Sequence, residues 1–219
     1  MASPYDLSEA TADDAPSIAA LYSLSWKSDF ARLQFGDLDP TALATSLTPG
    51  LAETITKDDV QVIVARDPST REVVAVAQWK LPADASAESP EAREERQRFE
   101  DEIHRNKLPD TSNKDLIMDF HIGLRTLRER LTEGQKYFST HPELRGKGIG
   151  SRLIAWPFAQ ADEQQALVYL ETAADNPAKR LYQKLGFEEK DSFTILDLSR
   201  YGGEGSHTHI ALIRYPRRV

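Results

Sequence analysis

The stretch HPELRGKGIGSRLI, residues 141–154, decides how we interpret this chain. Three glycines alternate with other residues in it: Gly146, Gly148 and Gly150. Glycine lets the backbone approach another group closely, and the helix expected to start here offers unpaired N–H groups and a partial positive charge. Three basic side chains stand in the same stretch: Arg145, Lys147 and Arg152. The stretch therefore predicts a phosphate or pyrophosphate site at a helix start.

Three other interpretations of this stretch compete with a phosphate site. A Walker A loop needs Ser or Thr after its Lys, but Lys147 is followed by Gly148. A dinucleotide fingerprint needs the spacing G-x-G-x-x-G and an acidic residue after a second strand, and the spacing here is G-x-G-x-G. A tight turn without a ligand stays open, although three alternating glycines and three cations argue against it.

The amino-acid composition excludes several classes of protein and of mechanism. The 219 residues carry 35 acidic and 27 basic side chains, for a net charge of -8, so we expect no nucleic-acid partner. The absence of cysteine excludes disulfides and an acyl-enzyme on a thiol. The N-terminal residues lack a basic and apolar leader, and nowhere do about 18 apolar residues stand in a row. We expect a cytoplasmic protein without a membrane partner.

Hydrophobic periodicity predicts alternating strands and helices. Around the glycine-rich stretch we expect strands at 136–140 and 167–172, a helix reaching about Gln164 that Pro157 should kink, and a helix over 177–185. Before it we expect a strand at 5–10, a helix opened by the capping box of Thr11 to Asp14, a short helix at 51–56 after an irregular stretch, and a hairpin of 60–65 with 72–79. Runs at 192–198 and 209–215 suggest a closing hairpin.

The segment from Pro82 to Thr132 has a different composition. It is rich in Glu, Arg, Asp and Lys, and its apolar residues keep a helical period from Leu116 to Leu131. We expect a helical insertion at about 82–132 that lies over a single domain spanning 1–219.

At this point the sequence resembles the GNAT superfamily of acyl-CoA N-acyltransferases. The family's phosphate loop has Gln or Arg, two residues, Gly, one residue, then Gly or Ala, and Arg145, Gly148 and Gly150 fit it. The segments AQADEQQALVYLETA (159–173) and LYQKLGF (181–187) follow in the family's order. The resemblance implies an α/β fold, with a twisted mixed sheet of about seven strands, helices on both faces and the helical insertion.

The resemblance also implies acetyl-CoA as cosubstrate and direct transfer in a ternary complex. In this family the acyl carbonyl is held by backbone N–H groups of the strand before the loop, and a Tyr protonates the departing thiolate. Tyr182 occupies that Tyr position, although its place on an apolar helix face also fits a core residue. The implied cofactor-binding residues are Phe138, Ser139, Thr140, Arg145, Gly146, Lys147, Gly148, Ile149, Gly150, Ser151, Arg152 and Asn176. Asn176 is one residue nearer the Tyr than the family's Asn, and it also fits a helix cap.

A protonated amine with a pKa near about 10.4 must lose a proton before it attacks the thioester. Glu171, at the carboxyl end of its strand, is our candidate base. With Tyr182 it makes up the predicted catalytic pair. The alternatives that spacing leaves open are Glu143, His141, Asp119 and His121.

Two groups of side chains complete the candidates. His207 and His209 share one face of a strand, but no third ligand stands in register, so we predict no metal. Four aromatic residues are candidates for an acceptor pocket or for plain core: Trp26, Phe30, Phe35 and Trp79.

These features, with the resemblance, predict an N-acetyltransferase that moves an acetyl group from acetyl-CoA to the primary amine of a small molecule. A protein or peptide amine as acceptor, and a catalytically silent acyl-CoA-binding sensor, are the alternatives. The protein could be a monomer or a homodimer.

Replacing Gly148 by Glu tests the phosphate site. The side chain and its negative charge should abolish binding of acetyl-CoA, measured by calorimetry, because both intrude on the expected anion. An affinity equal to that of the unmodified protein would contradict the assignment of the loop.

Overall fold

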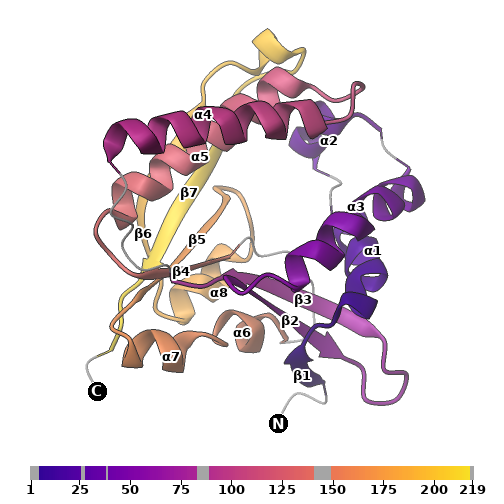
Figure 1. Cartoon of the computed structure of the whole chain (residues 1–219), viewed down its shortest axis with the longest axis vertical. Helices are drawn as coiled ribbons and strands as arrows, with labels where there is room; N and C mark the ends of the chain where they lie inside the picture. The colour runs from indigo at the N-terminus through magenta and orange to yellow at the C-terminus, as the bar shows by residue number, and fades with distance from the viewer. Residues whose placement is uncertain (1–4, 26–27, 38, 83–88, 141–148, 218–219) are drawn as a thin grey trace.

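The computed structural model describes residues 5–25, 28–37, 39–82, 89–140 and 149–217 (Figure 1). Seven strands form one sheet in the order β1-β2-β3-β4-β5-β7-β6. They are β1 (Asp6–Glu9), β2 (Val60–Arg66), β3 (Val73–Lys80), β4 (Tyr137–Thr140), β5 (Leu167–Ala173), β6 (Glu188–Ile195) and β7 (His207–Arg214). Only the β4–β5 pair is parallel within this part of the chain. The predicted mixed sheet of about seven strands is confirmed.

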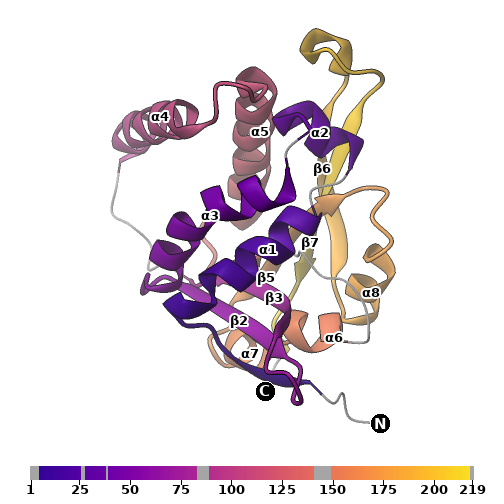
Figure 2. The same cartoon turned by 90° about the vertical axis from the view of Figure 1, so that its right-hand side faces the viewer.

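Helices cover both faces of the sheet (Figures 1 and 2). The α-helices are α1 (Ala15–Ser25), α2 (Asp29–Phe35), α3 (Pro40–Ile55), α4 (Pro90–Lys107), α5 (Lys114–Thr132), α6 (Ile149–Ile154), α7 (Phe158–Glu163) and α8 (Lys179–Lys184). Two short 3-10 helices are η1 (Ala12–Asp14) and η2 (Leu198–Tyr201). The two faces are covered by different sets of helices: α6, α7 and α8 on one, and α1, α3 and α5 on the other.

Side-chain alternation along the strands separates two cores. Toward α6, α7 and α8 the sheet buries Ile63, Ala77, Trp79, Phe138, Val168, Leu170 and Leu212. Toward the other helices it buries Val62, Val64, Val76, Leu167, Tyr169, Ala211 and Ile213. Each large side chain buried in this way stabilises the fold by about 1.5–3 kcal/mol relative to exposure. The two cores fix which strand residues can reach either side of the sheet.

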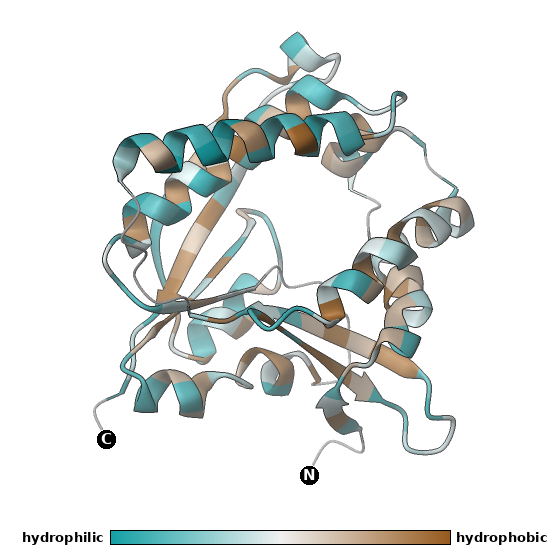
Figure 3. Cartoon of the chain, viewed as in Figure 1, coloured by the Kyte–Doolittle hydropathy of each residue, from teal (hydrophilic) through white to brown (hydrophobic). Residues whose placement is uncertain are grey.

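Residues 90–132 form two long helices, as the sequence predicts. The apolar stripe of α5, including Leu124 and Leu127, packs on β5 and β7. Gly123 allows close approach to β6, because a Cβ there would lie 2.2 Å from the ring of Phe193. α4 packs on α5 (Figure 2) and is mostly hydrophilic along its length (Figure 3), with no buried residue. α5 is therefore the helix that closes this face of the sheet.

The capping box at the first helix is confirmed. The backbone N–H of Thr11 donates to the Asp14 carboxylate at 2.8 Å. Arg66, on β2, donates to the same carboxylate at 2.7 Å. Burial acts to raise the pKa of Asp14, but the hydrogen bonds from Arg66 and Thr11 outweigh it and hold that pKa below its usual value. Asp14 thus ties the helix start to the sheet.

The parallel pair of β4 and β5 ends before β5 does. Their register runs from Tyr137 opposite Leu167 to Thr140 opposite Leu170. β5 continues to Ala173, paired on its other edge with β7. Beyond Leu170 the first edge of β5 has no strand partner among the described residues. Ligands of open α/β sheets bind at such carboxyl ends of parallel strands.

The expectation of an irregular stretch from Asp29 to Gly50 was wrong. Ser28 accepts a hydrogen bond from the Ala31 N–H at 3.1 Å and begins α2. Asp39 accepts one from the Ala42 N–H at 2.7 Å and begins α3. α3 then continues through Pro49, because its packing against α1 and β2 offsets the lost hydrogen bond.

Three other boundaries differ from the expected ones. The helix expected to reach Gln164 is two helices, α6 and α7, with Pro157 at the start of the second, since proline has no N–H to continue the first. The last helix begins at Lys179 and not at Pro177. The closing hairpin pairs Glu188–Ile195 with His207–Arg214, and residues 198–201 turn into a 3-10 helix.

One buried ion pair joins α7 to β7. Arg214 is 3% exposed and donates to both carboxylate oxygens of Asp162 at 2.8 Å. Its guanidinium also lies 4.1 Å from the centre of the Phe158 ring. The hydrogen bonds from Arg214 lower the pKa of Asp162. The pair is fully satisfied, so loss of one member should leave an uncompensated buried charge.

We expect Asp162→Ala to lower the free energy of unfolding, measured with urea, by about 3–5 kcal/mol at pH 7. Because the pKa of Asp162 is lowered in the folded state, this stability should be present above the unfolded value of 3.8 and lost as the pH falls below it. The control is Asp6→Ala, whose exposed pair with Arg71 should contribute about 1 kcal/mol or less. Equal losses in the two variants would contradict this account.

Candidate functional site

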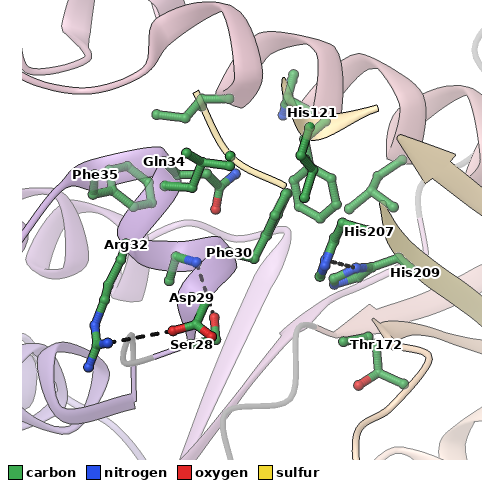
Figure 4. A pocket seen from close by; sticks show the side chains of 18 of the residues that line it. Ser28, Asp29, Phe30, Arg32, Gln34, Phe35, His121, Thr172, His207 and His209 are labelled. Atoms are coloured by element: carbon green, nitrogen blue, oxygen red, sulfur yellow. Dashed lines mark hydrogen bonds and ion pairs between the residues drawn. The ribbon is translucent and has the colours of Figure 1, made fainter. Parts of the chain in front are cut away.

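A cavity of about 1610 Å³ lies where the carboxyl end of β5 meets α2, α5 and the start of β7. Its lining comes from segments that are far apart in the sequence (Figure 4). It opens next to Leu170, the last residue of β5 that pairs with β4 among the described residues. A concave space at the end of parallel strands is the expected place for a substrate.

Helical spacing places the α5 residues of this cavity. The cavity is lined by three residues of α5 at intervals of four: Phe120, Leu124 and Arg128. It is also lined by the residues that directly follow the first two, His121 and Arg125. α2 lines the opposite side over its whole length. The cap at Ser28 that starts α2 therefore also sets one wall of the cavity.

Glu171 is a buried carboxylate at the edge of this cavity. It is 4% exposed, and its Oε1 accepts a hydrogen bond from the Tyr169 hydroxyl at 2.7 Å. Arg128 Nη1 lies 3.8 Å from the same oxygen. The other oxygen, Oε2, is buried and makes no hydrogen bond to any described residue. Burial raises the pKa of Glu171, and the Tyr169 hydroxyl and the Arg128 charge offset this only in part.

The second arginine of the cavity is already paired. Arg125 donates to both oxygens of Asp101, on α4, at 2.5 and 2.7 Å. Those hydrogen bonds lower the pKa of Asp101. Burial, together with the nearby His104 and Arg125, lowers the pKa of His121, so its ring is neutral at pH 7. The charge of Arg125 is therefore already paired with Asp101 of the same protein.

Four rings meet at one end of the cavity (Figure 4). Phe30 from α2 stacks on His207 with ring centres 3.5 Å apart and planes 6° apart. Phe120 from α5 lies edge-on to His209 at 4.7 Å and to Phe30 at 5.0 Å. His207 Nε2 and His209 Nδ1 are 3.0 Å apart and share a hydrogen bond. We call these four residues the aromatic wall.

Tyr182 lies on the other face of the sheet. It is 1% exposed, packs with Phe138 and Leu170 in the core under α8, and has its ring centre 6.2 Å from that of Phe187. The predicted alternative, that it is a core residue, and the predicted catalytic role both fit this placement. Its role as a proton donor stays a prediction.

Part of the predicted cofactor loop lies outside the described residues: Arg145, Gly146, Lys147 and Gly148. Of the neighbouring positions, Phe138 and Ile149 are buried in the core, and Ser139, Gly150 and Ser151 are half-buried. Thr140 ends β4, opposite Leu170. Their contacts with a cofactor stay predictions.

Two predicted cofactor residues already bind other parts of the protein. Arg152 donates to the Tyr5 carbonyl at 2.7 Å, which anchors α6 to the N-terminal residues. Asn176 donates to Thr172 Oγ1 at 2.7 Å and accepts from the Ala178 N–H at 2.9 Å. Asn176 thus joins β5 to the start of α8, close to the capping role that the sequence suggests.

The alternative bases and the aromatic candidates divide into residues that line the cavity and residues that do not. Among the alternative bases, His121 lines the cavity, whereas Asp119 accepts a hydrogen bond from the Tyr201 hydroxyl on the surface. Among the aromatic candidates, Phe30 and Phe35 line the cavity and Trp79 is a fully buried core residue. His141, Glu143 and Trp26 lie outside the described residues.

Sequence reasoning missed Tyr169 and Arg128. The alternation of a strand places Tyr169 and Glu171 on one face, so the tyrosine could have been found from its spacing to the candidate base. Arg128 could not, because its contact with Glu171 depends on how α5 crosses the sheet.

The described residues contain no group of three or more His, Asp or Glu side chains arranged to bind a metal ion. His207 and His209 instead bond to each other. Within the same part of the chain, every helix is too short or too polar for a bilayer-spanning segment.

Comparison with known proteins finds a family model that matches about a third of the chain. Residues 117–189 match the model described as the acetyltransferase (GNAT) domain. The matched range begins inside α5 and covers β4, β5 and α8. The description of 82–132 as an insertion therefore stays a prediction. The comparison with curated proteins found no match.

Several solved structures share the fold. One is a histone acetyltransferase HPA2-related acetyltransferase from Corynebacterium glutamicum, with a TM-score of 0.56, 20% identity and coverage of 99% of this chain and 98% of that one. A second is a phosphinothricin acetyltransferase from Sinorhizobium meliloti in complex with AcCoA, with a TM-score of 0.55, 16% identity and coverage of 97% and 89%. A third is an N-acetyltransferase from Staphylococcus aureus, with a TM-score of 0.53, 13% identity and coverage of 94% and 96%. At these identities the likeness shows the fold.

The raised pKa of Glu171 makes a stability prediction with a definite sign. An acid that binds its proton more tightly when folded stabilises the protein at low pH, and that stability is lost as the pH rises through the folded pKa. Above the ordinary value of 4.5, Glu171→Gln should therefore unfold with a free energy larger by about 1–3 kcal/mol, since no charge is buried. Urea titrations between about pH 4.5 and 8 measure this difference.

The matched control is Glu204→Gln, at an exposed carboxylate that lines the same cavity. Its free energy of unfolding should follow that of the unmodified protein at every pH. If Glu171→Gln follows it as well, the carboxylate of Glu171 is not held in the environment described here.

Proposed function

We propose that this chain, whose residues 117–189 match a GNAT acetyltransferase domain, transfers an acetyl group from acetyl-CoA directly to the primary amine of a small molecule. In this proposal Glu171 takes the proton of the amine and Tyr182 protonates the CoA thiolate. The finer points, the acyl group and the kind of acceptor, rest on the geometry of the cavity.

The observation that carries the proposal is the second carboxylate oxygen of Glu171. It is buried, has no hydrogen-bond partner among the described residues, and belongs to a residue that lines the cavity. A buried acceptor of this kind costs free energy unless a ligand donor reaches it. The N–H of an ammonium or amine is such a donor, and the raised pKa of Glu171 suits it to accept the proton.

The two proposed catalytic side chains lie on opposite faces of the sheet. Along β5, Leu170 packs with Tyr182 under α8, whereas Glu171 faces the cavity under α5. Between them lies the last described β4–β5 pair, Thr140 opposite Leu170. A thioester placed at the carboxyl end of this pair would have a base on one side and a proton donor on the other, which supports the division of roles.

The chemistry balances without a covalent intermediate. Glu171 removes one proton from the ammonium, and the neutral nitrogen attacks the thioester carbonyl carbon. The C–N bond forms to give a tetrahedral oxyanion, which collapses with cleavage of the C–S bond, and the thiolate takes a proton from Tyr182. The second proton on the former amine nitrogen returns to Tyr182 through solvent, and Glu171 releases its proton to solvent. Backbone N–H groups at the end of β4, Phe138 to Thr140, are proposed to stabilise the oxyanion. Arg128, near Glu171, favours the deprotonated carboxylate that starts each cycle.

The two helix walls of the cavity support a small acceptor. α2 and α5 wall the cavity on two sides, so a free amine can enter more readily than a lysine on a folded protein. A protein or peptide amine, and a sensor that binds acyl-CoA without turnover, are the competing outcomes of the experiment below.

The experiment measures thiol release. Because the chain has no cysteine, every thiol that a colorimetric reagent detects during turnover comes from CoA. Incubation with acetyl-CoA and a panel of small amines should release CoA in step with N-acetylated product detected by mass spectrometry. Tyr182→Phe should lower kcat by about 10²–10⁴-fold while the affinity for acetyl-CoA changes little, since only the proton donor is lost.

Tyr137→Phe is the control, because it makes the same change at a half-buried tyrosine on β4. It should turn over like the unmodified protein. Tight CoA binding without transfer to any amine would favour the sensor, and acetylation of peptides alone would favour a protein acceptor.

A further inference from the structure

We propose that the acceptor is an arylalkylamine, a primary amine joined to an aromatic ring by a short carbon chain, and that its ring packs against the aromatic wall of Phe30, Phe120, His207 and His209. This inference names the substrate class and rests on the proposed function for the reaction of the amine.

The wall is built from three separate elements that converge on the cavity. Phe30 comes from α2, Phe120 from α5, and the two histidines from β7. All four side chains are half-buried and line the cavity (Figure 4), whereas fully buried rings such as Trp79 lie in the core. The wall therefore presents ring surface to a ligand.

The strand register places the wall beside the proposed base. Glu171 on β5 lies opposite Ala211 on β7, and Ala173 lies opposite His209. All four side chains point to one face, because directly paired residues and residues two apart share a face. Glu171 and His209 are thus diagonal neighbours, at a typical distance of about 7–8 Å.

The other diagonal of this quartet is formed by two alanines. Ala173 lines the cavity and is too small to fill the space between Glu171 and His209, whereas Ala211 is fully buried beneath α5. A ligand can therefore extend from the carboxylate to the wall along the sheet surface. A ring with a spacer of about two carbon atoms spans the diagonal, with its amine at Glu171 and its ring at His209.

The wall suits an uncharged aromatic group. Phe120 already meets Phe30 and His209 edge-on, which is the geometry that aromatic pairs prefer. The hydrogen bond between the histidines turns ring nitrogens toward each other, so the rings offer their faces. Burial lowers the pKa of His207, so at neutral pH this ring carries no charge that would repel the ammonium.

The experiment compares two amines of the same shape class. Phenethylamine and cyclohexylethylamine have the same spacer and the same number of ring carbons, and only the first is aromatic. We expect the unmodified protein to favour phenethylamine in kcat/KM by roughly two- to ten-fold, the size of a specific aromatic contact. Phe120→Leu should remove this preference while leaving kcat/KM for cyclohexylethylamine within about three-fold.

The matched control is Phe158→Leu, which makes the same substitution at a half-buried phenylalanine on the opposite face of the sheet. It should keep the preference for phenethylamine. His209→Leu is a second test of the wall, in case Phe120→Leu fails to fold, and thermal unfolding of each variant identifies that case.

Calorimetry separates this inference from the proposed function. Each amine is titrated into the protein with and without CoA, so binding is measured whether or not acetyl transfer occurs. Stronger binding of phenethylamine, lost in Phe120→Leu, supports the wall even if no amine is acetylated, and the proposed function alone would then fail. Equal binding of the two amines, or a preference that Phe120→Leu and His209→Leu leave intact, overturns the inference while transfer to amines can still stand.

Discussion

The pairing of β5 is the constraint on which the site depends. Among the described residues its parallel pairing with β4 runs to Thr140 opposite Leu170, and β5 continues to Ala173 because β7 pairs with its other edge. The carboxyl end of this strand therefore offers both of its faces at one place. Alternation along β5 then assigns Leu170 to the core that holds Tyr182 and Glu171 to the cavity. Two successive residues of one strand, about 3.3 Å apart along its axis, thereby face opposite sides of the sheet.

The second constraint is the position of α5 over the sheet. Gly123 lets the helix approach Phe193 closely, and Leu124 and Leu127 seal it against β5 and β7. This fixes Phe120 and Arg128 at the ends of the same helical stripe, one in the aromatic wall and the other near Glu171. The ion pair of Arg125 with Asp101 then joins α4 to α5 on the outside. Most polar groups here are satisfied within the protein, which makes the unpaired oxygen of Glu171 stand out.

Short-range patterns in the sequence predicted most elements correctly. The β-branched runs of β2 and β3, the capping box of Thr11 and Asp14, and the strand and helix order around β5 are local signals, and the structure confirms them. The same reasoning failed at α3, which occupies part of the stretch expected to be irregular and is held together by packing against α1. It also missed α2, a helix of two turns whose only local signal is the Ser28 cap.

The sequence by itself determined the class of fold, because periodicity along the chain is a local property; it proposed Tyr182 through the family resemblance and Glu171 from its place at the end of a strand. Only the tertiary structure decided that Glu171 is buried at a cavity, that Tyr169 and Arg128 contact it, and that Phe30 meets His207. These contacts join α2, α5, β5 and β7, which are distant in the chain and meet only when the sheet forms and the helices pack on it. Burial and the pKa of a carboxylate follow from that packing, since they depend on what surrounds the group and not on its neighbours in sequence.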